Sequence, residues 1–292
     1  MTVNTAADPP ITLTGKARIA AIIGWPVSHS LSPRLHGYWL RHHAIDGTYV
    51  PLPVRPDDLA DALAALPKLG IAGANVTVPH KQAALAAMDI LSDAAIRIGA
   101  VNTIVVEDGR LLGDNTDGYG FIQNLRNAEP HWRAGNGPAV IIGAGGSARA
   151  VIAALLEAGV PELLLVNRTT SRAEAVAGDF GNAVKPVSWQ ARSGALRNAA
   201  LLVNATTEGM TGRPPLSLDL SELPPAAVVT DLVYVPLMTP LLVAAAARGN
   251  PIVDGLGMLL HQARPGFFRW FGVMPEVTPA LRAHVLAGLA AR

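Results

Sequence analysis

Apolar and polar positions divide the chain into short apolar runs that alternate with longer segments of helical periodicity. The runs that we interpret as strands are residues 18–23, 75–78, 102–106, 110–112, 139–142, 163–166, 201–204, 228–232 and 252–254. Helices are predicted from Ser32-Pro33, from about His80, over 117–126, after strands 139–142 and 163–166, and over 258–270 and 278–290. This alternation is typical of an α/β fold with largely parallel sheets.

Several local signals mark where these elements begin and end. Ser32 suits a helix N-cap and Pro33 the first helical position. Asp108-Gly109 suits the tight turn of a hairpin, because both residues tolerate positive φ. The glycine-rich stretch 133–138 has no periodicity and is the best linker candidate. Since 292 residues exceed one average domain, we expect two.

A glycine-rich turn follows the predicted strand 139–142. Gly143, Gly145 and Ala148 occupy the three positions of a G-x-G-x-x-[GA] pattern, between a strand and an alanine-rich helix. In a dinucleotide-binding fold these positions allow a tight turn, close approach of a pyrophosphate and close helix–strand packing. The alternative is a closely packed turn that binds nothing.

The next predicted strand ends in polar and basic residues. Asn167, Arg168 and Thr169 follow it directly, and Arg172 comes three residues later. An NAD site usually has an acid here for the ribose 2′-hydroxyl, and this segment has none. The arginine fork matches phosphate oxygens, so the pattern favours the 2′-phosphate of NADP. Alternatively, the two arginines form a solvated helix face.

Further polar residues interrupt the ends of the N-terminal strands. Lys81 is expected in the first turn of a helix, where a cation gains little from the helix dipole. An ammonium group can protonate the alkoxide that forms when a ketone accepts a hydride. Asp117 suits either catalysis or an N-cap, and Lys81 could be a surface residue. Ser30 with Ser32 would bind a carboxylate or cap a helix, and Asn75 and Asn102 would bind hydroxyls or tie down turns.

Composition narrows the classes of protein. Apolar residues make up 50% of the chain and charged residues 15%, which excludes a disordered chain. A balance of 23 basic and 22 acidic residues gives no electrostatic case for binding nucleic acid or an anionic membrane. The absence of cysteine excludes disulfides and thiolate metal sites, and the eight histidines lack the spacing of a helical zinc site. We therefore expect no metal.

The sequence also predicts where the protein works. Residues 1–10 carry no basic segment followed by an apolar stretch, so we expect no signal peptide. The longest apolar stretches, such as 241–247, are far shorter than the ~20 residues of a membrane-spanning helix. We expect a soluble, cytoplasmic protein.

Nine motifs together resemble the shikimate dehydrogenase family, over residues 22 to about 271. They are HSLSP (29–33), NVTVPHK (75–81), GAVNT (99–103), GDNTDG (113–118), GAGGSARA (143–150), NRT (167–169), NATTEGM (204–210), DLVYVPLMTPLL (231–242) and GLGMLLHQA (255–263). Each motif alone is a modest signal. Their presence in this order strongly indicates the family.

The resemblance implies a function and a set of site residues. It implies NADP-dependent interconversion of shikimate and 3-dehydroshikimate in chorismate and aromatic amino acid biosynthesis. Lys81 and Asp117 look like the family's catalytic pair. The substrate-binding residues implied are Ser30, Ser32, Thr77, Asn102, Tyr234 and Gln262. The cofactor-binding residues expected are Gly143, Gly145, Gly146, Ser147, Ala148, Asn167, Arg168, Thr169, Arg172 and Gly255.

The resemblance also implies a domain organisation. Residues 1–116 and 255–292 would form an N-terminal α/β substrate and catalytic domain, to which the C-terminal helices return. Residues 117–254 would form a Rossmann-type, doubly wound NADP-binding domain. The chain would act as a monomer or homodimer.

Two residues depart from the family's pattern, and three alternatives stay open. Gly37 stands where asparagine is common, at a cost of roughly 0.5–1 kcal/mol of helix stability relative to alanine. Thr207 stands where serine is common. The alternatives are a quinate/shikimate dehydrogenase of broader specificity, a non-catalytic dinucleotide-binding regulatory paralogue, and an enzyme for a shikimate analogue.

Overall fold

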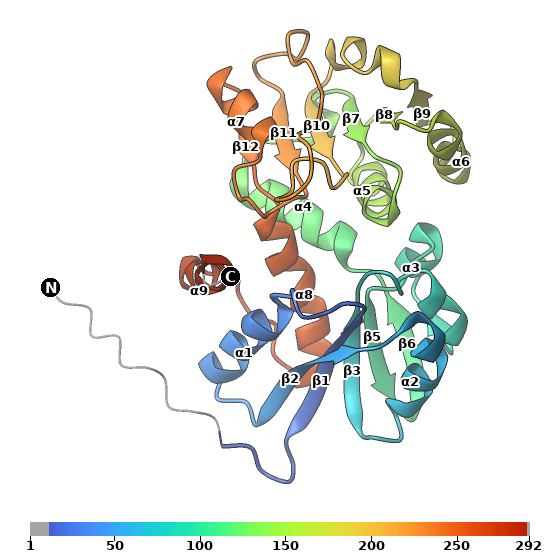
Figure 1. Cartoon of the computed structure of the whole chain (residues 1–292), viewed down its shortest axis with the longest axis vertical. Coiled ribbons are helices and arrows are strands. Elements are labelled where there is room, and N and C mark those ends of the chain that lie inside the picture. Colours follow the sequence, from blue (N-terminus) through green and yellow to red (C-terminus); the bar gives the residue numbers. More distant parts are fainter. Residues whose placement is uncertain (1–11, 291–292) are drawn as a thin grey trace, which may run out of the picture. The chain divides into compact units, whose positions relative to one another are not determined.

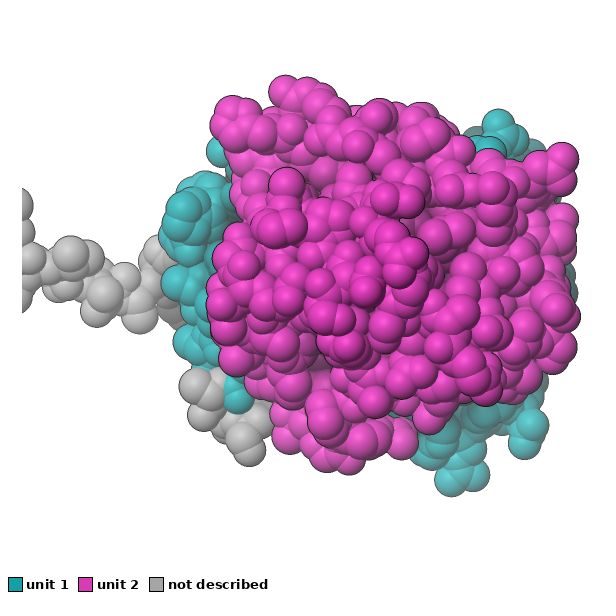
Figure 2. Space-filling view, turned by 90° about the horizontal axis from the view of Figure 1, so that it is seen from above, with its two compact units in different colours: residues 1–114, 263–292 teal, residues 115–262 magenta. Residues whose placement is uncertain are grey.

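The chain folds into two compact units, each with its own sheet. The structure is a computed structural model that describes residues 12–290. Unit 1 comprises the described residues up to Asp114 and from Ala263 onward, and unit 2 comprises Asn115–Gln262. Figure 2 colours the two units separately. The expectation of no signal peptide concerns residues 1–10, which lie outside the described residues.

Unit 1 contains a mixed six-stranded sheet (Figure 1). Its strands are β1 (Arg18–Gly24), β2 (Gly47–Pro53), β3 (Ile71–Val76), β4 (Ile90–Leu91), β5 (Thr103–Glu107) and β6 (Arg110–Asp114). They lie in the order β2-β1-β3-β5-β6-β4. β1 pairs in parallel with β2 and β3, whereas β5 is antiparallel to both β3 and β6.

The helices of unit 1 pack on the two faces of this sheet, except for the C-terminal helix (Pro279–Ala290), which packs on the first helix (Ser32–His42). They are α1 (Ser32–His42), α2 (Leu59–Ala65), α3 (Asp93–Ile98) and α9 (Pro279–Ala290), with the second part of α8 (Leu256–Phe271), whose Ala263 begins the return of the chain to this unit. On one face, Leu59 and Leu63 of α2 pack on Ala74 and Val76 of β3. On the other, rings from α1 and α8 gather around Tyr49. Successive strand residues thus serve opposite faces.

Unit 2 contains a fully parallel six-stranded sheet (Figure 1). Its strands are β7 (Ala139–Ile142), β8 (Leu163–Val166), β9 (Val184–Val187), β10 (Leu201–Asn204), β11 (Val228–Asp231) and β12 (Ile252–Val253). The order is β12-β11-β10-β7-β8-β9, so the first strand lies at the centre and the chain winds outward in both directions. This is the doubly wound arrangement, and the strand order reverses between β7 and β10.

Helices cover both faces of the second sheet. They are α4 (Asp117–Ala128), α5 (Gly146–Glu157), α6 (Thr170–Phe180) and α7 (Pro240–Ala247), with the first part of α8. Ile141 belongs to the apolar cluster under α4, α5 and α6. Its neighbours Val140 and Ile142 belong to the opposite cluster, which includes Leu241 and Leu242 of α7. A strand buried on both faces needs an unbroken apolar sequence, which β7 has.

Three sequence-based expectations about elements are wrong. Residues 133–138 do not link the units, because the chain passes between them at Asp114/Asn115 and Gln262/Ala263. The strand expected at 75–78 begins at Ile71 and ends at Val76. No helix begins near His80, since a turn and only a short 3₁₀ helix, η2 (Ala83–Ala87), follow. The helix-dipole argument for Lys81 therefore does not apply.

The other predicted strands and helices lie within a few residues of their expected positions. The sequence pattern does not predict β2, β4, β9, α2, α3 or α7. Within residues 12–290, no helix has both the length and the apolar character needed to cross a membrane.

Candidate functional site

The turn after β3 holds Lys81 by its backbone. The Thr77 amide donates to the Ile23 carbonyl at 2.9 Å, and the Trp25 amide donates to the Val78 carbonyl at 3.1 Å. The Val78–Pro79 peptide bond is cis. The carbonyl of Lys81 itself accepts a hydrogen bond of 2.8 Å from the Val101 amide. The half-buried Lys81 therefore starts from a backbone anchored on two neighbouring segments of unit 1.

Asn75 belongs to a buried hydrogen-bond network rather than to an open surface. Its Oδ1 accepts from the Tyr49 hydroxyl at 2.7 Å, and its Nδ2 donates to the Asn102 carbonyl at 3.1 Å and to Thr103 Oγ1 at 3.3 Å. Thr103 Oγ1 in turn donates to Asn102 Oδ1 at 2.9 Å. Asn75 thus ties down the strand ends, and the network fixes the orientation of the Asn102 amide.

Ser30 and Ser32 lie at the start of α1. The residue at the N-cap is Leu31, not Ser32, so the expected serine cap is wrong, and Ser32 and Pro33 open the helix. Ser30 Oγ accepts a hydrogen bond of 3.2 Å from the Ser32 amide. Ser32 is buried, and its hydroxyl lies near that of Tyr49. Burial raises the pKa of Tyr49 well above its usual value, so this phenol stays a neutral donor.

His36 lies behind these serines, inside an aromatic cluster. Its ring stacks on Tyr49 with a centroid distance of 3.9 Å, and Trp39, Phe267 and Trp270 lie within 6 Å of it. Neither ring nitrogen has a hydrogen-bond partner within residues 12–290. Burial lowers the pKa of His36 to about 3, and the nearby Asn75 amide opposes only part of that shift. A neutral imidazole here completes the apolar wall under the serines.

Asp117 and Gln262 lie together in unit 2. Thr116, not Asp117, is the N-cap of α4, and the Asp117 amide donates to Asn115 Oδ1 at 3.1 Å. The Thr116 hydroxyl donates to the Gln262 carbonyl at 2.9 Å. A side chain at Gly120 would clash with Gln262, since its Cβ would lie 2.6 Å from that of Gln262. The close approach of α4 and α8 thus brings both residues into one neighbourhood.

The substrate residues implied by the resemblance lie on both units. Ser30, Ser32, Thr77, Lys81 and Asn102 belong to unit 1, whereas Asp117, Tyr234 and Gln262 belong to unit 2. Tyr234 is half-buried and follows β11.

The glycine turn after β7 forms the wall of a cavity in unit 2. Gly143 has a φ of +113°, and a Cβ there would lie 2.9 Å from the Thr206 side chain, so only glycine fits. Gly145 and Gly146 have open space where a Cβ would project. Gly145 is the N-cap of α5, whose first turn has no side-chain cap. The open glycines and uncapped helix start fit a pyrophosphate.

The cavity has a volume of about 330 Å³ and lies at the switch point of the sheet. The expected cofactor residues that line it are Gly143, Gly145, Gly146, Ser147, Asn167 and Arg168. Five further lining residues follow β9 and β10 and were not expected from the sequence: Trp189, Ala205, Thr206, Thr207 and Glu208. β9 lies beside β8, and β10 lies beside β7. Because the carboxyl ends of parallel strands lie at the same edge of a sheet, the loops after β9 and β10 could have been predicted to take part in the cofactor site.

Four expected cofactor residues do not line this cavity. Ala148 is fully buried in the first turn of α5, and Thr169 and Arg172 are exposed at the start of α6. Gly255 approaches the backbone so closely that a Cβ would lie 2.5 Å from the Leu232 carbonyl. That packing accounts for the glycine without a ligand.

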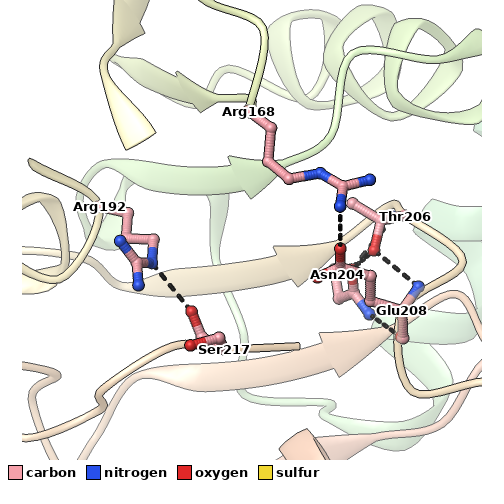
Figure 3. A network of polar contacts seen from close by, with 6 residues as sticks. All are labelled: Arg168, Arg192, Asn204, Thr206, Glu208 and Ser217. Atoms are coloured by element: carbon pink, nitrogen blue, oxygen red, sulfur yellow. Dashed lines mark hydrogen bonds and ion pairs between the residues drawn. The ribbon is translucent and has the colours of Figure 1, made fainter. Parts of the chain in front are cut away.

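Two arginines behave differently around the cavity (Figure 3). Arg168 is largely exposed, and its Nη1 lies 3.1 Å from Glu208 Oε1. Arg192 lies over the Trp189 ring, 4.5 Å from its centroid, and its Nε donates to the Ser217 carbonyl at 2.9 Å. These contacts hold the Trp189 ring in place at the cavity wall. Within residues 12–290, no three His, Asp or Glu side chains are placed to hold a metal ion.

The doubly wound sheet, the glycine turn and the cavity at its switch point define a dinucleotide-binding protein. Comparison with family models identifies three consecutive matches. Residues 22–104 match the shikimate dehydrogenase substrate binding domain, and residues 131–211 match shikimate / quinate 5-dehydrogenase. Residues 255–283 match the shikimate 5′-dehydrogenase C-terminal domain.

Individual relatives agree with the family models. A shikimate dehydrogenase (NADP(+)) from Rhodospirillum rubrum is 64% identical over 280 residues, which are 94% of this chain and 99% of the relative. The shikimate 5-dehydrogenase of Thermus thermophilus, solved with NADP(H) and shikimate, superposes with a TM-score of 0.83 at 37% identity, over 93% of this chain and 99% of that one. Quinate dehydrogenase from Corynebacterium glutamicum, solved with NAD, gives 0.86 at 33% identity, over 93% and 99%. The chain belongs to the shikimate dehydrogenase family.

Proposed function

We propose that this protein is an NADP-dependent shikimate dehydrogenase, which reversibly reduces 3-dehydroshikimate to shikimate. The observation that carries the proposal is its 64% identity to a relative of that name over nearly the full length of both chains. The cavity in unit 2 supports it, because open glycines, an uncapped helix start and Arg168 suit a phosphate-rich dinucleotide.

The proposed reaction needs one proton transfer from the protein. NADPH supplies the hydride that the carbonyl carbon accepts, and the carbonyl oxygen then needs a proton. Lys81 Nζ donates that proton in the direction of reduction and accepts it from the hydroxyl in the direction of oxidation. As an ammonium group, it also stabilises the negative charge that develops on the oxygen. Because hydrogen bonds anchor the Lys81 backbone, the position of Nζ varies mainly through rotation within the side chain.

The remaining residues bind and orient the substrate in this proposal. Ser30 and Ser32 bind its carboxylate, and Thr77, Asn102, Tyr234 and Gln262 surround the ring and its hydroxyls. Asp117 orients Lys81 and the substrate. The buried network from Tyr49 through Asn75 supports the proposed role of Asn102, because it holds that amide in one orientation. Gly143, Gly145, Gly146, Ser147, Asn167 and Arg168 hold the cofactor in this proposal. Thr169 and Arg172 contribute contacts from the start of α6, and Ala148 and Gly255 contribute packing.

The proposal is tested by following nicotinamide absorbance with shikimate or quinate, each with NADP⁺ or NAD⁺. Of the four pairs, only shikimate with NADP⁺ is expected to give rapid reduction of the coenzyme. Faster turnover with quinate would favour the broader quinate/shikimate enzyme, and silence with all four pairs would favour the regulatory or analogue-using alternatives. A cytoplasmic location and a monomeric or homodimeric state stay predictions from the sequence.

Replacing Lys81 with alanine tests the proposed acid/base. Loss of proton transfer by a positioned side chain typically costs 10²- to 10⁴-fold, so Lys81→Ala should lower kcat by about that factor. Because Lys81 belongs to unit 1, NADP⁺ binding measured by calorimetry should not change. Lys68→Ala, which removes an exposed lysine of the same unit, is the control. A Lys81→Ala enzyme with near-normal kcat would contradict the assignment.

A further inference from the structure

Glu208 places a carboxylate in the cavity that we assign to NADP. It follows β10, lines the same cavity as the glycine turn, and contacts Arg168 at 3.1 Å (Figure 3). Only 14% of the Glu208 side chain is exposed, against 73% of Arg168. The carboxylate is thus seated in the wall, whereas the arginine extends over it from the solvent side.

The loop that carries Glu208 is held by a chain of hydrogen bonds. The Glu208 amide donates to Thr206 Oγ1 at 3.0 Å, and Thr206 Oγ1 donates to Asn204 Oδ1 at 2.8 Å. Asn204 Nδ2 donates both to the Glu208 carbonyl at 3.1 Å and to Asp231 Oδ1 at 3.0 Å. Asp231 is fully buried and also accepts from the Thr239 hydroxyl. The glutamate backbone is therefore fixed to β10 and β11.

The charge of the cavity is unusual for a phosphate-rich ligand. Among the described residues that line it, Arg168 is the one cation and Glu208 the one anion, so their formal charges cancel. A 2′-phosphate carries about −1.5 to −2 charges near neutral pH. While Arg168 Nη1 is paired with Glu208, that nitrogen is not available to the 2′-phosphate, and the negative charge of the carboxylate stays close to the arginine. The 2′-hydroxyl of NAD, in contrast, is a donor for which an acidic side chain is the usual partner.

We propose that Glu208 sets how strongly this protein prefers NADP over NAD. It competes with the 2′-phosphate for Arg168 and repels that phosphate, so it weakens NADP binding while tolerating NAD. Glu208 thereby supplies, from the loop after β10, the acid that the loop after β8 lacks. The inference rests on the proposed position of the cofactor in this cavity.

The test compares Glu208→Gln with the unmodified protein by titration calorimetry, using NADP⁺ and NAD⁺ as separate ligands. Glutamine keeps the shape and removes the charge. Removing one charge a few ångströms from a phosphate at a partly exposed site is expected to tighten NADP⁺ binding about tenfold. The Kd for NAD⁺ should stay the same or rise. Glu208→Ser, which also removes the charge, is a second variant should the first fold poorly.

The matched control is Glu222→Gln. Glu222 also pairs with an exposed arginine of unit 2, at 3.0 Å from Arg197, but it does not line the cavity. It should leave both Kd values unchanged, which separates a local effect from a change in net charge. Equal tightening in the control would contradict the inference.

Arg168→Gln separates failure of the inference from failure of the cofactor assignment. It should weaken NADP⁺ binding strongly and NAD⁺ binding little. If it does so while Glu208→Gln leaves NADP⁺ affinity unchanged or weaker, the role of Glu208 is wrong and the cofactor site stands. If neither substitution changes NADP⁺ affinity, the assignment of the cavity is wrong, and the inference is overturned with it.

Discussion

His36 is a histidine that the fold keeps uncharged. Stacked on Tyr49 and enclosed by rings from α1 and α8, it has a pKa lowered to about 3 by burial. In the unfolded chain the same imidazole titrates near 6.5. Between these values the unfolded state binds a proton that the folded state does not. Stability should therefore be greatest above pH 6.5 and fall as the pH decreases toward 3.

The expected slope from His36 is about 1.4 kcal/mol per pH unit in that window. His36→Leu, which is similar in volume, should reduce the pH dependence of the unfolding free energy between pH 6.5 and 4.5 by about that slope. The measurement is urea unfolding at several pH values. His131→Asn, which changes an exposed histidine, is the control. If His36→Leu left the slope unchanged, the buried imidazole would not be the group responsible.

Residue types predicted six of the residues that line the cavity in unit 2, but they did not indicate which of the other polar residues are engaged within the protein. Asn75 and Asn102 looked equivalent in the sequence, and only the tertiary contacts reveal that Asn75 is engaged by Tyr49, Asn102 and Thr103. Glu208 was missed for a different reason. The usual rule for dinucleotide specificity inspects the second strand, whereas this acid reaches the cavity from the loop after β10.

At the scale of elements, α1 contains a glycine that its packing does not require. A Cβ on Gly37 would meet only the flexible end of Arg41, at 3.5 Å. Glycine in a helix costs roughly 0.5–1 kcal/mol relative to alanine. Gly37→Ala should therefore raise the unfolding free energy by about that amount in urea titrations.

A glycine-to-alanine substitution in α4 should lower the unfolding free energy instead. A Cβ on Gly120 would lie 2.7 Å from the Met258 carbonyl, so the helices would have to separate. Gly120→Ala is thus a matched control that should destabilise the protein. Equal effects of the two substitutions would show that helix propensity, rather than the room around each glycine, decides the outcome.

The elements that periodicity predicted well are those with strong local patterns, such as β7, β8 and α4. β2 was not predicted. It contains Pro51 and Pro53, which are rare inside strands, and β2 tolerates them because it lies at the edge of the sheet. The helix expected at His80 failed because tertiary hydrogen bonds, including one from the Val101 amide to Lys81, hold that segment as a turn. The local sequence pattern does not indicate hydrogen-bond partners that lie far away in the chain.

At the scale of the whole molecule, each unit has its own sheet and its own apolar clusters. Ligand binding stabilises the folded state that binds it, by about 2.7 kcal/mol at a concentration 100 times Kd. Because the cavity assigned to NADP lies within unit 2, saturating NADP⁺ should slow hydrogen exchange in β7, β8 and β10 up to ~100-fold.

Exchange in β1, β2 and β3 of unit 1 provides the internal reference for this experiment. Mass spectrometry of peptides from both sheets, with and without NADP⁺, measures the two effects together. A smaller change in unit 1 is expected if the units open separately. Equal protection of both sheets would show instead that they unfold as one cooperative body.

The two charged residues of the NADP cavity reach it from opposite halves of a doubly wound sheet. Arg168 follows β8, Glu208 follows β10, and each loop keeps its own hydrogen bonds. Under the proposed role of Glu208, the preference between the two coenzymes depends on two residues in separate loops, and each residue can be substituted without the other. During evolution, a single substitution in the loop after β10 can therefore change the preference for NADP over NAD while Arg168 is retained.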